Sequence, residues 1–178
     1  MKKLISLLLL LSMLIPAASA ETLPDTYNWY EIFVYSYQDS NGDGIGDLGG
    51  VRQRLDYIAD MGYTGIWFMP IMPSPSYHKY DAKNYYEIDW RFGTMEDLQE
   101  LIKLCDERNV KLILDLVINH TSNRHEWFEQ FREARINGDT ENPYYDFYSC
   151  ATTAEKVNGI TYQKIAGVDC WYECNFSS

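Results

Sequence analysis

The sequence predicts an α/β fold, because short strand-like runs alternate with segments of helical periodicity. Three strand-like runs stand at 30–35, 65–69 and 110–117, and the last of them is almost continuously apolar. An uninterrupted apolar run is typical of a parallel strand that is buried on both faces. Parallel strands connected through helices define the α/β class.

The first strand is predicted at 30–35, where aromatic and β-branched residues dominate, and a loop rich in Asp, Gly and Asn follows it. A helix comes next, because apolar residues recur there at three- and four-residue spacing. These residues are Val51, Leu55, Ile58 and Ala59, and Gly62 is expected to end the helix. The second strand, 65–69, is stopped by Pro70 and Pro73.

A long polar and aromatic loop at 72–92 separates the second strand from the second helix. Thr94 and Asp97 have the spacing of a capping box, which satisfies two backbone N–H groups at a helix start. The apolar stripe expected to be buried on that helix consists of Leu98, Leu101, Ile102 and Cys105. The third strand then follows at 110–117.

Regular structure is harder to assign beyond residue 120. A further helix is predicted at 126–135, ending before Asn137, and only loop or irregular strand is indicated after Asn142. The residues of this helix expected to face inward are Trp127, Phe128 and Phe131. Three parallel strands suit either an open, doubly wound sheet or the first units of a barrel, which needs eight strands and about 250 residues. Periodicity alone leaves both architectures open.

The composition excludes one class of partner. The 178 residues carry a net charge of −11, and an acidic surface argues against nucleic acid, whose phosphates favour a basic face. The 15 tyrosines and 5 tryptophans suit either stacking on sugar rings or filling a core.

The first 20 residues have the pattern of a secretory signal. Two lysines precede an apolar run at 4–15, and Ala18-Ser19-Ala20 follows as an A-x-A-like cleavage site. The apolar run is shorter than the span of about 20 residues that crosses a bilayer. We therefore expect cleavage after Ala20, a secreted mature chain and no stable membrane partner.

The chain has four cysteines. In an exported protein Cys150, Cys170 and Cys174 are close enough in sequence to supply one disulfide, and the sequence does not assign its pairing. Cys105 lies on a helical apolar stripe and is expected to be a buried thiol.

The most specific local motif is the acidic loop at 39–47. Oxygen donors at alternate positions, with Gly at the sixth, copy the first nine positions of a calcium-binding loop. The expected ligands are the side chains of Asp39, Asn41, Asp43 and Asp47 and the backbone carbonyl of Ile45. Gly50 stands where an EF-hand carries Glu, so the predicted Ca²⁺ site lies outside the EF-hand family. A solvated acidic turn is the alternative, although such crowded donors repel one another without a cation.

Residues 44–49 also match G-x-G-x-x-G between a strand and a helix, which is a dinucleotide-binding pattern. Asp43 and Asp47 would place negative charge where a pyrophosphate has to sit, which disfavours this interpretation.

Polar groups follow the second and third predicted strands. Asp115, Asn119 and His120 stand near the end of the third strand, and the motif His-Lys-Tyr-Asp at 78–81 lies in the loop after the second. In an α/β barrel the segments that follow the strands face one end, so we expect the two groups to lie side by side. A tyrosine ring, an imidazole and a carboxylate there would suit one sugar. Taken singly, His78 better fits a surface residue of the loop, and Asp115 better fits a structural acceptor that holds neighbouring loops.

These motifs occur in the order found in the α-amylase family of glycoside hydrolases (family 13), which the chain resembles over about residues 27 to 130. The matching segments are Tyr30–Tyr37 with the acidic loop, Gly65–Pro70, His78–Asp81, Phe92–Thr94 and Asp115–His120. After the signal peptide expected at 1–20, the resemblance implies the first three βα units of a TIM (β/α)8 barrel at 21–118, an incomplete barrel. It implies that 119–178 is the truncated start of an inserted, loop-rich domain B.

The resemblance also implies which residues form the site. His78, Tyr80, Asp81 and His120 would bind substrate, with Tyr80 stacking on a sugar, and Asp115 would support the site. The implied metal ligands are Asp39, Asn41, Asp43, Ile45, Asp47 and Asn119.

Members of this family cleave α-glucosidic bonds with retention, through an Asp nucleophile, a Glu acid/base and a further Asp. The nucleophile and the acid/base must lie about 5 Å apart. The resemblance places all three carboxylates on strands beyond Ser178, so no residue of this chain is expected to be catalytic and the chain as given is expected to be inactive. The implied function is that of a secreted α-glucan hydrolase acting on α-1,4 bonds in starch-like polymers.

Two residues depart from the family pattern. Lys79 replaces a glycine common between the His and the Tyr, and Tyr77 stands where exo-acting α-glucosidases often carry Asp, which favours an endo-acting α-amylase. Two alternatives of other classes remain. A non-catalytic relative, such as the heavy chain of an amino-acid transporter, would need a membrane-spanning helix. A secreted calcium-binding module would leave an apolar sheet edge unpaired.

Overall fold

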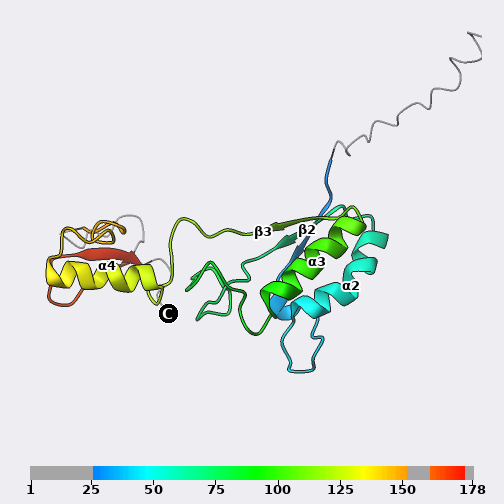
Figure 1. Ribbon diagram of the computed structural model, residues 1–178, viewed down its shortest axis with the longest axis horizontal. Coiled ribbons are helices and arrows are strands. Elements are labelled where there is room, and N and C mark those ends of the chain that lie inside the picture. The colour runs from blue at the N-terminus through cyan, green and yellow to red at the C-terminus, as the bar shows by residue number, and fades with distance from the viewer. Residues whose placement is uncertain (1–25, 152–160, 175–178) are drawn as a thin grey trace, which may run out of the picture.

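The computed structural model describes residues 26–151 and 161–174. The predicted signal peptide, Met1–Ala20, lies outside the described residues. The elements in chain order are β1 (Trp29–Ile32), η1 (Val34–Ser36), α2 (Leu48–Asp60), β2 (Gly65–Phe68), α3 (Met95–Glu107), β3 (Lys111–Leu114), α4 (Glu126–Asn137), β4 (Thr161–Lys164) and β5 (Trp171–Cys174). Figure 1 shows the sheet of β1 to β3 with α2 and α3 at one end, and α4 with the last two strands at the other.

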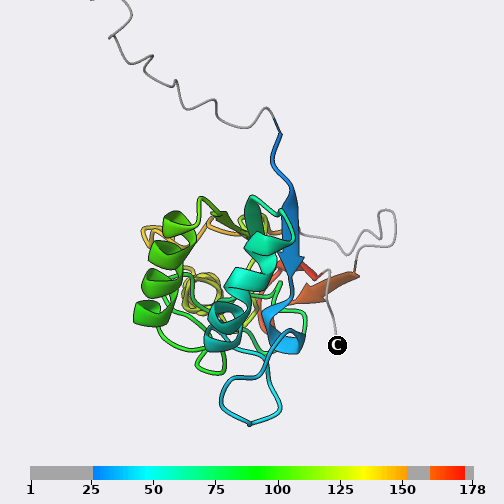
Figure 2. The same cartoon turned by 90° about the vertical axis from the view of Figure 1, so that its right-hand side faces the viewer.

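The three N-terminal strands form one parallel sheet in the order β1-β2-β3. Ile32 pairs with Phe68, which pairs with Leu114, so all three strands end at the same edge. Helices α2 and α3 run side by side against this sheet (Figures 1 and 2). The predicted alternation of parallel strands and helices is therefore confirmed, and the sheet of the described residues is open.

The strands are shorter than predicted. After β1 ends at Ile32 the chain coils into η1, where the backbone N–H of Ser36 donates to Phe33 O at 3.2 Å. β2 ends at Phe68, and β3 spans four residues instead of 110–117. Past β3 one backbone bond continues the pairing, from Asp115 N to Phe68 O at 2.8 Å, and no further strand of the described residues pairs with this segment.

The expectation that the third strand is buried on both faces is wrong for this chain. Ile113 and Leu114 are each 41% exposed, and beyond the strand Leu116 is 66% and Ile118 83% exposed. The physical reason is that β3 has a neighbour on one side only, namely β2. Among the described residues, no strand pairs with its other edge.

Both helices on the sheet begin with a side-chain cap. Asp47 accepts from Gly50 N at 2.6 Å at the start of α2. The predicted capping box of α3 is confirmed, because Thr94 Oγ1 accepts from Asp97 N and Asp97 Oδ2 accepts from Thr94 N. These caps fix where the helices start against the sheet.

The buried stripe of α3 differs from the prediction in one residue. Leu98, Leu101 and Cys105 face the core, whereas Ile102 is 41% exposed. The three buried residues follow helical spacing, and Ile102 lies just beyond the edge of their stripe. Cys105 is the expected buried thiol, and burial raises its pKa to about 11.

A second, smaller core forms around α4. Phe128 and Phe131 pack with Ile165 and Cys170, separately from the core under α2 and α3. The helix continues to Asn137, two residues beyond the prediction, and Gly138 ends it at φ 63°. Trp127, predicted to face inward, is only half-buried.

The C-terminal part is more regular than the sequence indicated. β4 and β5 pair as regular antiparallel strands, where only loop or irregular strand was expected. Cys150 and Cys170 form the one disulfide expected among the three C-terminal cysteines, and Cys174 is free. Within 26–151 and 161–174 no helix has the length and apolar character needed to span a bilayer.

Candidate substrate-binding site

The candidate site lies where β2 and β3 end. Asp115 follows β3 directly, and its carboxylate accepts from Trp67 Nε1 at 2.8 Å and from the Tyr80 hydroxyl at 2.7 Å. Trp67 belongs to β2, and Tyr80 to the loop after it. Burial is the main reason why the pKa of Tyr80 is raised to about 12, and the hydrogen bond to Asp115 adds to the effect. Tyr80 is therefore a neutral donor at neutral pH, and Asp115 joins two neighbouring units of the fold.

The segment after β3 is fastened to the same loop. A ring nitrogen of His120, Nε2, lies 3.0 Å from Tyr80 O. The Tyr85 hydroxyl donates to Val117 O at 2.6 Å and to His120 O at 3.0 Å. The expected juxtaposition of the 78–81 motif with Asp115 and His120 is therefore confirmed.

His78 and Asp81 are held mainly by their own loop. His78 Nδ1 accepts from Tyr80 N at 3.1 Å and lies 3.2 Å from Ser76 Oγ. Asp81 Oδ1 accepts from Ser74 Oγ at 2.5 Å and from Ser76 Oγ. The His78 and Tyr80 rings are nearly parallel, with centroids 6.2 Å apart, so together they form an aromatic patch next to Asp115.

A cavity of about 390 Å³ adjoins this site at the end of β3. Its walls are largely aromatic and aliphatic and include His120 and Asn119. The aromatic residues that line it are Tyr85, Trp127, Phe147 and Tyr148. Apolar walls with a few polar groups are usual for small-molecule sites. Aromatic rings of this kind can stack on the apolar faces of sugars.

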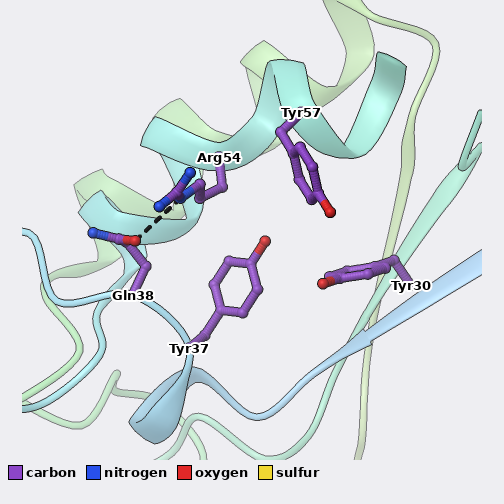
Figure 3. A pocket seen from close by; sticks show the side chains of 5 residues that line it. All are labelled: Tyr30, Tyr37, Gln38, Arg54 and Tyr57. Carbon is purple, nitrogen blue, oxygen red and sulfur yellow. Dashed lines mark hydrogen bonds between the residues drawn. The ribbon is translucent and has the colours of Figure 1, made fainter. Parts of the chain in front are cut away.

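A second cavity, of about 340 Å³, contains none of the predicted site residues. Figure 3 shows that Tyr30, Tyr37 and Tyr57 line one space with Gln38 and Arg54. Arg54 Nε donates to Gln38 Oε1 at 3.1 Å. Burial is the main reason why the pKa of Tyr37 is raised to about 12, and the neighbouring Tyr30 adds to the effect. The Tyr37 hydroxyl therefore stays protonated.

Several residues that support the site were not predicted from the sequence. Trp67 looked like an ordinary strand residue, yet its indole binds Asp115. Lys79 is completely buried, and its Nζ lies 2.5 Å from Asp89 Oδ2. Arg91 binds the same carboxylate. The one signal for Lys79 was its position in place of a glycine, and nothing local pointed to Asp89.

The acidic loop projects from the body of the molecule (Figures 1 and 2). Asp39 accepts backbone N–H groups of Asn41, Gly42 and Gly44 at 2.7 to 3.0 Å. The Gly44 bond is the main reason why the pKa of Asp39 is lowered. Within residues 26–151 and 161–174, no group of three His, Cys, Asp or Glu residues is placed to hold a metal ion.

The other expected ligands are placed as follows. Asn41 and Asp43 each accept a backbone N–H two residues further on, the second from Ile45. Asp47 accepts from Ser40 N at 3.1 Å as well as capping α2. Asn119 is exposed and lines the cavity at the end of β3.

The glycines at 46 and 50 serve close packing. A Cβ at Gly46 would lie 2.0 Å from Val34 O, and one at Gly50 would lie 1.9 Å from Gln38 O. Because Asp47 already caps the start of α2, a negatively charged pyrophosphate would meet a carboxylate there. The geometry contradicts the dinucleotide-binding interpretation.

A family model described as Alpha amylase, catalytic domain, matches residues 31–175. Alpha-amylase 3 of Dictyoglomus thermophilum is 46% identical over 140 residues, which cover 78% of this chain and 27% of that protein. Oligo-1,6-glucosidase of Bacillus cereus is 46% identical over 120 residues, covering 67% of this chain and 21% of that protein.

Two solved structures are also similar to this chain. Eubacterium rectale Amy13B has a TM-score of 0.76 and 46% identity, covering 85% of this chain and 30% of that chain. An alpha-amylase from H. orenii has a TM-score of 0.72 and 40% identity, covering 84% of this chain and 32% of that chain. The chain thus spans about a third or less of the proteins to which it is similar.

Proposed function

The chain belongs to the α-amylase family of glycoside hydrolases, and on that premise we propose that the protein hydrolyses α-glucosidic bonds in glucans with retention of anomeric configuration. The sheet of β1 to β3 with α2 and α3 corresponds to part of the family's (β/α)8 barrel, and the barrel is not closed among the described residues. Because the chain spans 27% of the first curated relative, the activity is proposed for the protein as a whole.

One observation carries the proposal: Tyr80 and Trp67 converge on Asp115 at the strand ends, and His120 binds the backbone of Tyr80. A fixed tyrosine face beside imidazoles suits a sugar, because the ring covers the apolar face and the imidazoles reach hydroxyls. Asp115 already accepts two hydrogen bonds, so its role is to hold Tyr80 rather than to attack a substrate. Under this proposal, later barrel units of the protein as a whole would supply the nucleophile, the acid/base and the third carboxylate.

The test is expression of the complete reading frame that contains these residues. We expect release of reducing ends from starch and maltoheptaose, with the α-anomer formed first in NMR spectra recorded during turnover. Tyr80→Ala should lower kcat/KM by about 100-fold, because the substrate loses a positioning surface. The control is Tyr86→Ala, the same change in the same loop at a residue that is 78% exposed. Binding of maltoheptaose without hydrolysis would instead indicate a non-catalytic relative.

Endo action on α-1,4 bonds of starch-like polymers is the finer part of the proposal. Its support is Tyr77, which is 59% exposed and packs edge-on against Tyr35 at 4.7 Å and Phe33 at 5.0 Å. An aromatic side chain at this position offers no carboxylate that could anchor the end of a glucan chain. We expect early products of mixed length from starch. Release of glucose alone from the start would show exo action and overturn this part.

Ca²⁺ is the proposed metal of the acidic loop. Carboxylate, amide and carbonyl oxygens are the ligands that Ca²⁺ prefers, and residues 39–47 supply all three kinds. Asn119 would hold a separate ion beside domain B. Calorimetric titration should show binding that Asp43→Asn weakens by about tenfold or more, while Asp60→Asn on α2 leaves it unchanged. The absence of any heat in the unsubstituted protein would refute the metal proposal.

The proposal that the protein is exported rests only on the signal-peptide pattern of residues 1–20. Removal of the signal peptide would leave a mature chain that starts at Glu21. N-terminal sequencing of the protein from the culture medium of its source tests this. Recovery of the intact Met1 form inside the cells would contradict it.

A further inference from the structure

The loop at 72–92, which carries His78 and Tyr80, contains a fully buried cation. Lys79 is 0% exposed although it lies between His78 and Tyr80, which are both only partly buried. Its backbone has φ 70°, a left-handed conformation that residues with a side chain rarely adopt. A buried lysine in this conformation persists only where its surroundings hold it in place.

The ammonium group forms an ion pair with Asp89. Nζ lies 2.5 Å from Asp89 Oδ2 and 5.3 Å from the centre of the Phe92 ring. Asp89 is 2% exposed and also accepts from Arg91 Nε at 2.8 Å and Nη2 at 2.7 Å. The cluster of Lys79, Asp89 and Arg91 therefore links the middle of the loop to its far end.

This cluster is itself fixed to the fold. Asp89 N donates to Ile71 O at 2.9 Å, just after β2, and Phe92 O accepts from Leu48 N at 2.9 Å at the start of α2. Lys79 N donates to Ser76 Oγ at 3.3 Å. Lys79 is therefore an anchor that ties the residues between Ser76 and Tyr80 to the rigid part of the protein.

We propose that Lys79 is a positioning residue for substrate, because its ion pair with Asp89 fixes the backbone from which His78 and Tyr80 face the glucan. This inference rests on the proposed function for the identity of the ligand. A glycine at this position would adopt φ 70° without strain but would leave the loop without this anchor. Compared with a glycine, the lysine has less backbone freedom, but its ion pair fixes the orientation of His78 and Tyr80.

The experiment uses the complete protein and two readouts. The first is kcat and KM on maltoheptaose, expressed per folded molecule. The second needs no ligand: the NMR signal of the Trp67 indole N–H, which reports on Asp115 and therefore on Tyr80. The variants are Lys79→Met, Asp89→Asn and the double variant. The matched control is Lys83→Met, the same change at an exposed lysine in the same loop.

We expect Lys79→Met to lower kcat/KM about tenfold and to shift the Trp67 signal, with Lys83→Met unchanged in both. Because the two residues act as a pair, Asp89→Asn should cost much less in the Lys79→Met background than alone. If Lys79→Met does not fold, Lys79→Gly tests the same loss without backbone strain, and Asp89→Asn tests it from the other partner.

A folded Lys79 variant with kcat/KM within about twofold of the original and an unshifted Trp67 signal would overturn the inference. If the unsubstituted protein acts on no α-glucan, the proposed function fails. The Trp67 signal then decides alone whether Lys79 orients the loop, and an unshifted signal overturns that too.

Discussion

Asp115 and Asp89 are two buried or half-buried carboxylates with different roles. Asp115 accepts from two neutral aromatic donors, Trp67 and Tyr80, and so joins β2 to the loop that follows it. Asp89 instead neutralises two cations, Lys79 and Arg91. Burial alone would raise the pKa of Asp89, but hydrogen bonds from Arg91 and Lys79 outweigh it and hold the value at about 2. Burial lowers the pKa of Lys79, because it disfavours the charged ammonium; the ion pair with Asp89 opposes this effect, and the nearby charge of Arg91 adds to it.

Asp89→Asn should destabilise the protein by about 3 kcal/mol at pH 7, because it leaves a buried lysine without its charge partner. Asp89 titrates near 2 in the folded protein and at 3.8 when unperturbed, so the unfolded chain binds more protons between these values. The stability that this group contributes is present above pH 3.8 and is lost as the pH falls towards 2.

Urea unfolding at pH 7, 4 and 2 checks this prediction. The difference in unfolding free energy between the original protein and Asp89→Asn should shrink by about 2 kcal/mol between pH 4 and pH 2. Asp60→Asn on α2 serves as the control, because Asp60 forms no ion pair within the described part of the chain. A difference that stays constant with pH would show that Asp89 is not the titrating group.

At the scale of elements, each described α-helix begins with a different cap. Asp47 caps α2, the Thr94–Asp97 box caps α3, and the His125 imidazole caps α4 by accepting from Trp127 N at 3.1 Å. An imidazole can accept at Nδ1 only while that nitrogen is unprotonated. Burial lowers the pKa of His125 below its usual 6.5, which favours the accepting form.

The start of α4 should therefore weaken in acid. Because the folded pKa lies below 6.5, the unfolded chain binds more protons in this range, and stability falls as the pH falls below 6.5. His125→Asn keeps a side-chain cap but does not titrate. We expect the loss of stability between pH 7 and pH 5, measured by urea unfolding, to be smaller in this variant. His78→Asn, a histidine that caps no helix, should keep the loss; an equal loss in both variants would contradict the prediction.

At the scale of the whole molecule, the main feature is an open sheet beside a separate small core. The edge of β3 and the segment after it expose Ile113, Leu114, Leu116 and Ile118. Exposed apolar residues along an unpaired strand favour association with other chains. The closed barrel of the family has no such edge, because its last strand pairs with the first.

We expect the 178-residue chain to bind a hydrophobic dye and to self-associate at micromolar concentration. The double variant Leu116→Lys, Ile118→Lys should roughly halve the dye signal, because these are the most exposed apolar side chains of the edge. The control is Ile136→Lys, an isoleucine on α4 that is 52% exposed. Dye fluorescence and sedimentation velocity measure the two effects. Equal effects of the edge and control variants would show that the edge of β3 is not the surface that binds the dye and mediates self-association.

Much of the fold followed from local patterns in the sequence. The order of strands and helices, the capping box at Thr94 and the buried Cys105 rest on periodicity and on contacts within a few residues. The placement of the 78–81 motif beside His120 also followed, because segments after parallel strands share one end of the fold.

Only the tertiary structure decided which partner each polar group meets. Asp89 lies ten residues from Lys79 in sequence, and Trp67 forty-eight from Asp115, so no local pattern encodes either contact. The exposure of β3 likewise depends on which strands stand beside it and not on its own apolar run. Local composition sets how a segment prefers to fold, whereas burial and pairing are set by what the rest of the chain brings to it.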